Sequence, residues 1–208
     1  PSLAFVCPIG VDPQFHTILS EAQLSKVEFS DKELTGLKPR FAIGFVTRYW
    51  DKPGYTRRKR YELINSVVHT LSSLGLPVII LGPGWENCSN RVQNENVFYC
   101  QTKYMNYPVI YNMMKVFCSV SLHEGGPMPL LESMCCGVTP VVTNTGFAYD
   151  VLSPGLNDSL ISTNASSAEI VSAILKSYFS VSQPQEYRDI ACHCSFKNAA
   201  LMLARKFN

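Results

Sequence analysis

The chain has 208 residues, of which 46% are hydrophobic and 16% carry a charge, so it can bury a substantial core and is not a disordered chain. Its net charge of +2 gives no long-range field that would attract nucleic acid or a membrane surface, and the basic run from Arg57 to Arg60 is too short to do so alone. No apolar run approaches the roughly 18 residues of a membrane-spanning helix. We therefore predict a globular domain with neither a nucleic-acid partner nor an integral membrane segment.

Eight cysteines are present, and none forms a C-x-x-C pair. Several lie inside apolar runs, as Cys118 does in VFCSVSL, so we interpret them as reduced thiols in the core. The sequence Cys192-His193-Cys194 has no second pair of ligand residues nearby, and we interpret it as part of a packed helix rather than a zinc site. No signal peptide opens the sequence, so the expected location is the cytoplasm.

Residues 1–40 have mixed polarity and no sustained periodicity. They contain turn sequences such as PIGVDPQF and ELTGLKPR. This pattern indicates a linker segment that leads in from another part of a larger protein. The predicted domain covers residues 41–208.

From Phe41 onward, short apolar runs bounded by turn residues alternate with segments of helical periodicity. FAIGFVT suits a strand that is buried on both faces, and the helical pattern after it stops at Gly75. The predicted strands cover residues 41–47, 76–82, 96–100, 116–122, 139–143 and 158–161. The predicted helices cover residues 57–75, 107–115, 129–136, 147–152, 165–179 and 184–205.

Strands that alternate with helices at this spacing require right-handed crossovers and a parallel sheet with helices on both faces. The predicted fold class is therefore α/β, with a doubly wound, Rossmann-like parallel sheet. In such sheets ligands bind beyond the carboxyl ends of the strands. The expected site lies in the loops after residues 47, 82, 100, 122 and 143.

The segment SLHEGGPMPLLESMCCG follows the fourth predicted strand and carries two carboxylates, Glu124 and Glu132. Pro129 suits the first turn of a helix, and Gly137 suits the position after its end. Free amides at such a helix start can bind a phosphate, which the helix dipole also favours. Three amides of the preceding loop and first turn would join them, those of Gly125, Gly126 and Met128.

Glu132 lies near the end of the first helical turn, where a carboxylate can accept two hydrogen bonds from vicinal hydroxyls such as those of a ribose. A simpler interpretation stays open at this point. A glutamate near a helix start stabilises the helix dipole in any protein, and Gly-Gly-Pro is a common turn.

The stretch EGGPMPLLESMCCGVTPVVTN resembles the segment of retaining glycosyltransferases of the GT-B fold in which seven residues separate two glutamates. The class is the glycosyl transferases group 1 (family 4-like), typified by sucrose synthase, bacterial mannosyltransferases and glycogen synthase. Three flanking stretches resemble its interdomain linker, first strand and closing helix, namely PIGVDPQF, FAIGFVTR and YRDIACHCSFKNAALML. The resemblance covers nearly all of the chain, but only the C-terminal, donor-binding half of a GT-B enzyme.

The resemblance implies that Arg48, at the end of the first strand, and a lysine after it grip the pyrophosphate of the donor. We rank Lys59 first for that lysine and Lys52 second. Glu124 would contact hydroxyls of the donor sugar near the reacting carbon, and Glu132 would bind the ribose. Arg48, Lys59 and Glu124 are thus the predicted catalytic residues.

Pro127 departs from the family, which usually has glycine there, and a proline removes one amide donor. The phosphate contacts would then fall to Gly126, Met128 and Leu130. Tyr104 lies where an aromatic residue usually packs against the base. No metal ligand is expected, because positive side chains would take the part that a metal plays in other glycosyltransferases.

The predicted function is the donor-binding domain of a retaining, metal-independent glycosyltransferase that transfers a hexose from a UDP- or GDP-linked sugar, with no further cofactor. An N-terminal GT-B domain, in the same chain or as a separate subunit, would carry the acceptor site, so this chain alone would be incomplete for transfer. A non-catalytic nucleotide-binding or partner-docking module remains an alternative. An NAD-dependent Rossmann enzyme is disfavoured, because no G-x-G-x-x-G follows the first strand.

Overall fold

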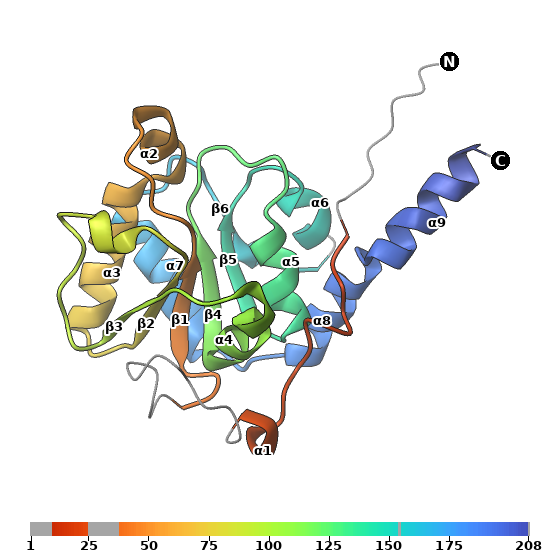
Figure 1. Cartoon of the computed structure of the whole chain (residues 1–208), viewed down its shortest axis with the longest axis horizontal. Coiled ribbons are helices and arrows are strands. Elements are labelled where there is room, and N and C mark those ends of the chain that lie inside the picture. The colour runs from red at the N-terminus through yellow and green to blue at the C-terminus, as the bar shows by residue number, and fades with distance from the viewer. Residues whose placement is uncertain (1–9, 25–37, 154, 208) are drawn as a thin grey trace.

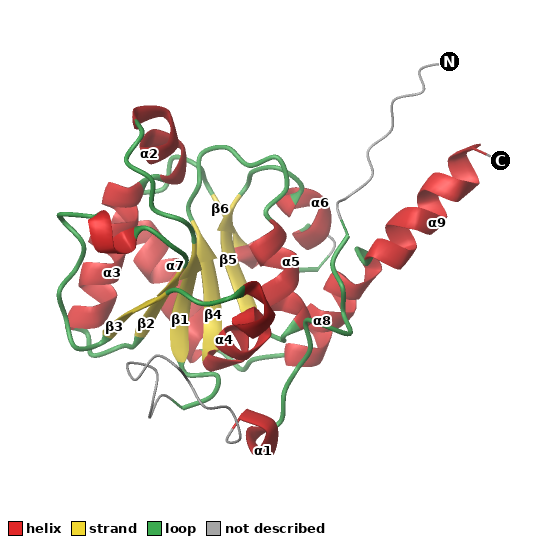
Figure 2. Cartoon of the chain, in the orientation of Figure 1, coloured by secondary structure: helices red, strands yellow, loops and turns green. Residues whose placement is uncertain are grey.

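The computed structural model describes residues 10–24, 38–153 and 155–207 of the chain. Its centre is a six-stranded sheet in the order β3-β2-β1-β4-β5-β6, in which every neighbouring pair is parallel (Figures 1 and 2). The strands are β1 (Ala42–Val46), β2 (Val78–Leu81), β3 (Val97–Cys100), β4 (Met114–Ser119), β5 (Thr139–Thr143) and β6 (Leu160–Ile161). The predicted doubly wound α/β class is confirmed.

Helices lie on both faces of the sheet (Figure 2). Helices α3 and α7 share one core cluster with it, and α4, α5, α6 and α8 share the other. The α-helices are α1 (Glu21–Leu24), α2 (Pro53–Lys59), α3 (Tyr61–Ser73), α4 (Tyr107–Met113), α5 (Met128–Cys135), α6 (Ala148–Leu152), α7 (Ser167–Phe179), α8 (Pro184–His193) and α9 (Phe196–Phe207). Short 3-10 helices are η2 (Trp85–Asn87), η3 (Tyr104–Asn106) and η4 (Asn157–Ser159). No helix in these described ranges is long and apolar enough to cross a membrane.

Strand β2 shows why the sheet forms from continuous apolar runs. All four of its residues are buried, and alternate side chains enter opposite clusters. Val78 and Ile80 pack with the helices α3 and α7, while Ile79 and Leu81 pack on the other face. Because each such side chain contributes about 1.5–3 kcal/mol on full burial, a strand covered on both faces needs apolar residues at every position.

The order of the strands reverses once, between β1 and β4. From β1 the chain continues to β2 and β3 on one side, and it then returns to build β4, β5 and β6 on the other. The loops that leave the carboxyl ends of β1 and β4 therefore open next to each other. This is the place where open α/β sheets bind their ligands.

The helix predicted over residues 57–75 is wrong in one respect, because two helices, α2 and α3, occupy this region. They are separated by Arg60, whose φ of 57° and ψ of 50° are left-handed. Its guanidinium donates hydrogen bonds to the carbonyl oxygens of Thr163, at 2.8 Å, and Ala165, at 3.2 Å. These tertiary bonds hold a backbone conformation that an arginine rarely adopts.

The helix predicted over 184–205 is likewise divided, into α8 and α9. Between them Ser195 forms an isolated parallel bridge with Val11, whose amide donates to the Cys194 carbonyl at 3.0 Å. A side chain at Gly10 would meet the backbone of Phe196 at 2.4 Å, so only glycine fits this crossing. Beyond it, α9 extends away from the body of the domain (Figure 1).

Smaller differences concern the ends of strands. Strand β4 covers Met114–Ser119 rather than 116–122, so the loop that carries Glu124 starts earlier than predicted. The last predicted strand, 158–161, keeps only Leu160–Ile161, because η4 covers Asn157–Ser159.

Residues 10–19 of the predicted linker lie against the domain. Val11 and His16 are buried, and Arg188 of α8 donates hydrogen bonds to the carbonyls of Pro13, at 2.8 Å, and His16, at 2.9 Å. Residues 1–9 and 25–37 lie outside the described residues, and with them the first two positions of PIGVDPQF. The origin of the segment in an N-terminal domain stays a prediction.

Arg188 also donates to the Cys135 carbonyl, at 2.6 Å, and so ties the leading segment to the end of α5. We expect Arg188→Ala to lower the free energy of unfolding by about 2–4 kcal/mol, because several carbonyls lose a charged donor at once. Urea denaturation measures this, with Arg205→Ala, an exposed site on α9, as the control that changes little. Equal stability of the two variants would mean that Arg188 does not hold the segment.

Candidate functional site

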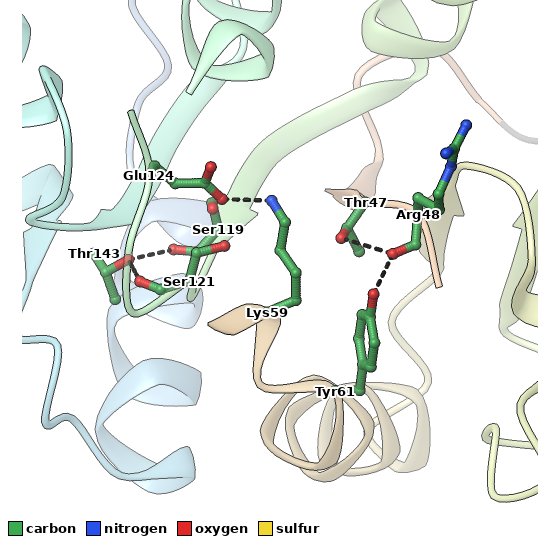
Figure 3. Close-up of polar contacts among 8 residues, drawn as sticks. All are labelled: Thr47, Arg48, Lys59, Tyr61, Ser119, Ser121, Glu124 and Thr143. Atoms are coloured by element: carbon green, nitrogen blue, oxygen red, sulfur yellow. Dashed lines mark hydrogen bonds and ion pairs between the residues drawn. The ribbon is translucent and has the colours of Figure 1, made fainter. Parts of the chain in front are cut away.

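The site lies where the loops after β1 and β4 meet (Figure 3). The loop after β4 is held at two points. The Leu122 amide donates to the Arg58 carbonyl at 2.9 Å, and the Thr143 hydroxyl donates to the Ser121 carbonyl at 2.7 Å. These bonds fix the start of the segment that carries Glu124 against α2 on one side and β5 on the other.

Lys59 and Glu124 form an ion pair, Nζ to Oε1, although 65 residues separate them (Figure 3). Their side chains are only 15% and 13% exposed, so water screens the two charges weakly. The left-handed Arg60 ends α2 directly after Lys59. The pair places a cation and a carboxylate together at the switch point of the sheet.

Lys52, the second candidate for the phosphate-binding lysine, lies elsewhere. It is exposed, and its ammonium lies 4.1 Å from the centre of the Trp50 ring in a cation–π contact. The structure thus brings Lys59, and not Lys52, to Glu124.

Arg48 follows β1 and is exposed. Its carbonyl accepts a hydrogen bond from the Tyr61 hydroxyl, while its guanidinium points away from the Lys59 and Glu124 pair (Figure 3). The positive charge of the guanidinium acts on the Tyr107 phenol. Burial and then the Glu132 carboxylate raise the pKa of Tyr107, and the charge of Arg48 opposes that rise. The charge of Arg48 therefore acts on Tyr107 and not within the pair of Lys59 and Glu124.

Glu132 is 5% exposed, and both of its carboxylate oxygens accept hydrogen bonds from tyrosines. Tyr104 of η3 donates to Oε1 at 2.7 Å, and Tyr111 of α4 donates to Oε2 at 2.6 Å. Burial first, and then the neighbouring carboxylate, raise the pKa of both phenols, so both remain protonated donors. The Glu132 carboxylate is therefore buried and accepts its hydrogen bonds from neutral donors.

His16 lies next to Tyr104 and was not predicted, and neither was Tyr111. The imidazole is buried, and its Nε2 lies 3.5 Å from the Tyr104 hydroxyl oxygen. The Asp12 carboxylate accepts a hydrogen bond from the Gln14 amide at 2.9 Å, and this bond stabilises the turn that precedes His16. The turn DPQF was a visible signal for a bend, but nothing local in the sequence shows that the bend ends on Glu132.

The amides at the start of α5 are partly used within the chain. The Met128 amide donates to the Gly126 carbonyl at 2.8 Å, and the Leu130 amide donates to the Pro127 carbonyl at 2.9 Å. A phosphate would have to replace these acceptors to reach the two amides. The amides of Gly125 and Gly126 have no such acceptor in the part of the chain that the structure describes.

Gly146, after β5, packs against the backbone of the loop that carries Glu124. Its φ is 56°, and an added Cβ would lie 2.8 Å from the Glu124 carbonyl oxygen. Any larger residue would push the Glu124 backbone out of place. The described residues contain no group of three His, Cys, Asp or Glu side chains that could hold a metal ion.

Comparison with known proteins identifies a family and similar folds. The family described as Glycosyl transferases group 1 matches residues 55–189, which is more than half of the chain. No curated protein matches the chain by sequence.

Solved structures match the fold at low sequence identity. Sucrose-phosphate synthase from Thermosynechococcus elongatus has a TM-score of 0.68 at 16% identity, over 97% of this chain and 51% of that one. A glycosyltransferase from Rickettsia africae has 0.73 at 13% identity, over 95% and 54%. Anabaena HepE in complex with UDP-glucose has 0.62 at 18% identity, over 96% and 52%. The chain thus spans about half the length of these structures.

Burial lowers the pKa of His16, and the charge of Glu132 only partly offsets this. Below pH 6.5, its ordinary pKa, the unfolded chain takes up a proton that the folded chain refuses, so stability should fall as the pH falls. The expected slope reaches about 1.4 kcal/mol per pH unit between 6.5 and the lowered pKa.

Urea denaturation from pH 7.5 to 5.0 measures the slope. His16→Gln should flatten it, while His69→Gln, at an exposed site on α3, should keep it. An unchanged slope in His16→Gln would mean that folding does not lower the pKa of His16.

Proposed function

Because the chain belongs to the glycosyl transferases group 1 family, we propose that it is the donor-binding half of a retaining glycosyltransferase, which transfers a hexose from a UDP- or GDP-linked sugar without a metal ion. The contact between Lys59 and Glu124 carries this proposal. It joins a cation that suits a diphosphate to a carboxylate that suits sugar hydroxyls, at the edge of the sheet where ligands bind.

Lys59 would neutralise the charge that develops on the departing nucleoside diphosphate. Glu124 holds this ammonium in position, so little reorganisation would be needed when a phosphate binds. Arg48, which follows β1, would supply a second positive charge to the diphosphate. The amides of Gly125 and Gly126 would complete the phosphate contacts.

The transfer itself would follow from this arrangement. An acceptor oxygen forms a bond to the anomeric carbon on the face from which the diphosphate leaves, while the bond between that carbon and the phosphate oxygen breaks. The proton of the acceptor hydroxyl passes to the leaving phosphate oxygen. Because both events use one face, the configuration is retained and no protein nucleophile is needed.

Three observations support the partner domain, the ligand and the location in this proposal. The chain spans about half of each similar structure, so we place the acceptor site on an N-terminal domain, in the same chain or as a separate subunit. HepE, a structural relative, holds UDP-glucose, which supports a nucleotide sugar as the ligand. The seven cysteines in the described part of the chain are free thiols, which suits the reducing cytoplasm.

Thermal unfolding of the chain with millimolar UDP, GDP, ADP or NAD tests the proposal. A nucleoside diphosphate at about 100 times its dissociation constant should add roughly 2.7 kcal/mol and raise the midpoint by several degrees. NAD should have no such effect. If no nucleoside diphosphate raises the midpoint, the donor-site proposal fails and the partner-docking alternative takes its place.

Substitution of the two glutamates should affect different steps, nucleotide binding for Glu132 and sugar transfer for Glu124. Glu132→Ala should weaken binding of the bare nucleoside diphosphate about tenfold, because the ribose hydroxyls lose a charged acceptor. Glu124→Ala should leave that affinity nearly unchanged and lower transfer when the complete two-domain enzyme is assayed. Calorimetric titration of both variants checks this, and a loss of bare nucleotide affinity in Glu124→Ala would contradict the division of roles.

A further inference from the structure

The two hydrogen bonds on Glu132 differ in how easily they can be exchanged. Tyr111 is completely buried within α4, so its hydroxyl cannot leave without disrupting the core. Tyr104 is 51% exposed and belongs to η3, which has no buried residue. The carboxylate therefore has one fixed donor and one that can move away.

We propose that the Tyr104 hydroxyl holds the place on Glu132 that a ribose hydroxyl takes when a nucleotide binds. This inference rests on the proposed function and adds to it a residue that sets nucleotide affinity. Tyr104 would act as a replaceable partner of Glu132, and not as a group that binds the nucleotide through its hydroxyl.

The need for such a partner follows from the burial of Glu132. A carboxylate that is 5% exposed has little access to water, and an oxygen without a donor would cost the free energy of an unmade charged hydrogen bond. The Tyr104 hydroxyl satisfies Oε1 at 2.7 Å. A ligand hydroxyl that donates to the same oxygen keeps the count of hydrogen bonds constant.

The surroundings of Tyr104 favour its release. Its other polar neighbour, His16 Nε2, is 3.5 Å from the hydroxyl oxygen, which is long for a hydrogen bond. Its ring contacts Phe15 and Tyr107 with centroid distances of 5.5 and 5.3 Å. Glu132 is therefore the principal polar partner that Tyr104 would give up, and a ribose hydroxyl compensates for that loss.

The variant Tyr104→Phe tests this inference, because it removes only the hydroxyl from a half-exposed ring. Two results should move in opposite directions. The melting temperature of the free chain should fall, since Oε1 loses its donor. The affinity for the nucleoside diphosphate that binds the unaltered chain should rise about tenfold, the factor that corresponds to one hydrogen bond to a charged group.

Two controls sharpen the test. The 2′,3′-dideoxy form of the same nucleotide lacks the hydroxyls that would replace Tyr104, so its affinity should be equal in both chains. Tyr111→Phe removes the other donor from Glu132, at a place that no ligand can reach, so it should lower the melting temperature without tightening binding.

Calorimetric titration of the three chains distinguishes the outcomes. Unchanged or weaker binding of the ribonucleotide to Tyr104→Phe would overturn the replacement of the hydroxyl while leaving the nucleotide site in place. An equal gain for the dideoxy form would also overturn it, because the gain would not depend on ligand hydroxyls. If no chain binds any nucleotide, the proposed function itself fails.

Discussion

The position of α5 depends on two arginines that meet its carbonyl end. Arg40, before β1, donates to the carbonyls of Cys136 and Gly137, each at 3.3 Å, and Arg188 of α8 donates to that of Cys135 at 2.6 Å. The last carbonyls of a helix lack partners within it, and the helix dipole makes this end negative, so two guanidinium groups suit it. With this end fixed, Glu132 and the loop before the helix are held at the switch point of the sheet.

The two carboxylates of the site differ in the groups that satisfy them. Glu124 is paired with the ammonium of Lys59, whereas Glu132 is surrounded by neutral hydroxyl donors. A buried carboxylate beside neutral donors can exchange one hydroxyl for another without a change in net charge. A carboxylate beside a cation keeps that cation available for an anion. The surroundings of Glu132 thus suit the hydroxyls of a diol. The pair of Glu124 and Lys59 suits a sugar that is linked to a negatively charged group.

Much of this arrangement was predictable because it depends on local sequence. The alternation of apolar runs and helical patterns predicted the sheet, and Pro129 and Gly137 indicated the start and the end of the helix that carries Glu132. The left-handed Arg60 was not predictable, because it depends on carbonyls 103 and 105 residues away. The same holds for Tyr111 and His16, which reach Glu132 only through the packing of segments that are far apart in the chain. Periodicity shows which face of an element is buried, but it does not show what that face meets.

The crossing of Gly10 with Phe196 has a consequence for the order of folding. Arg188 bonds residues 175 and 172 positions earlier, so these contacts close almost the whole chain into a loop. Closure over such a distance costs more entropy than any pairing of neighbouring strands, and we expect the sheet to form first. During synthesis His16 emerges long before α8 does. The surroundings of Glu132 would therefore be the last part of the domain to be completed, when the segment around His16 packs against α8.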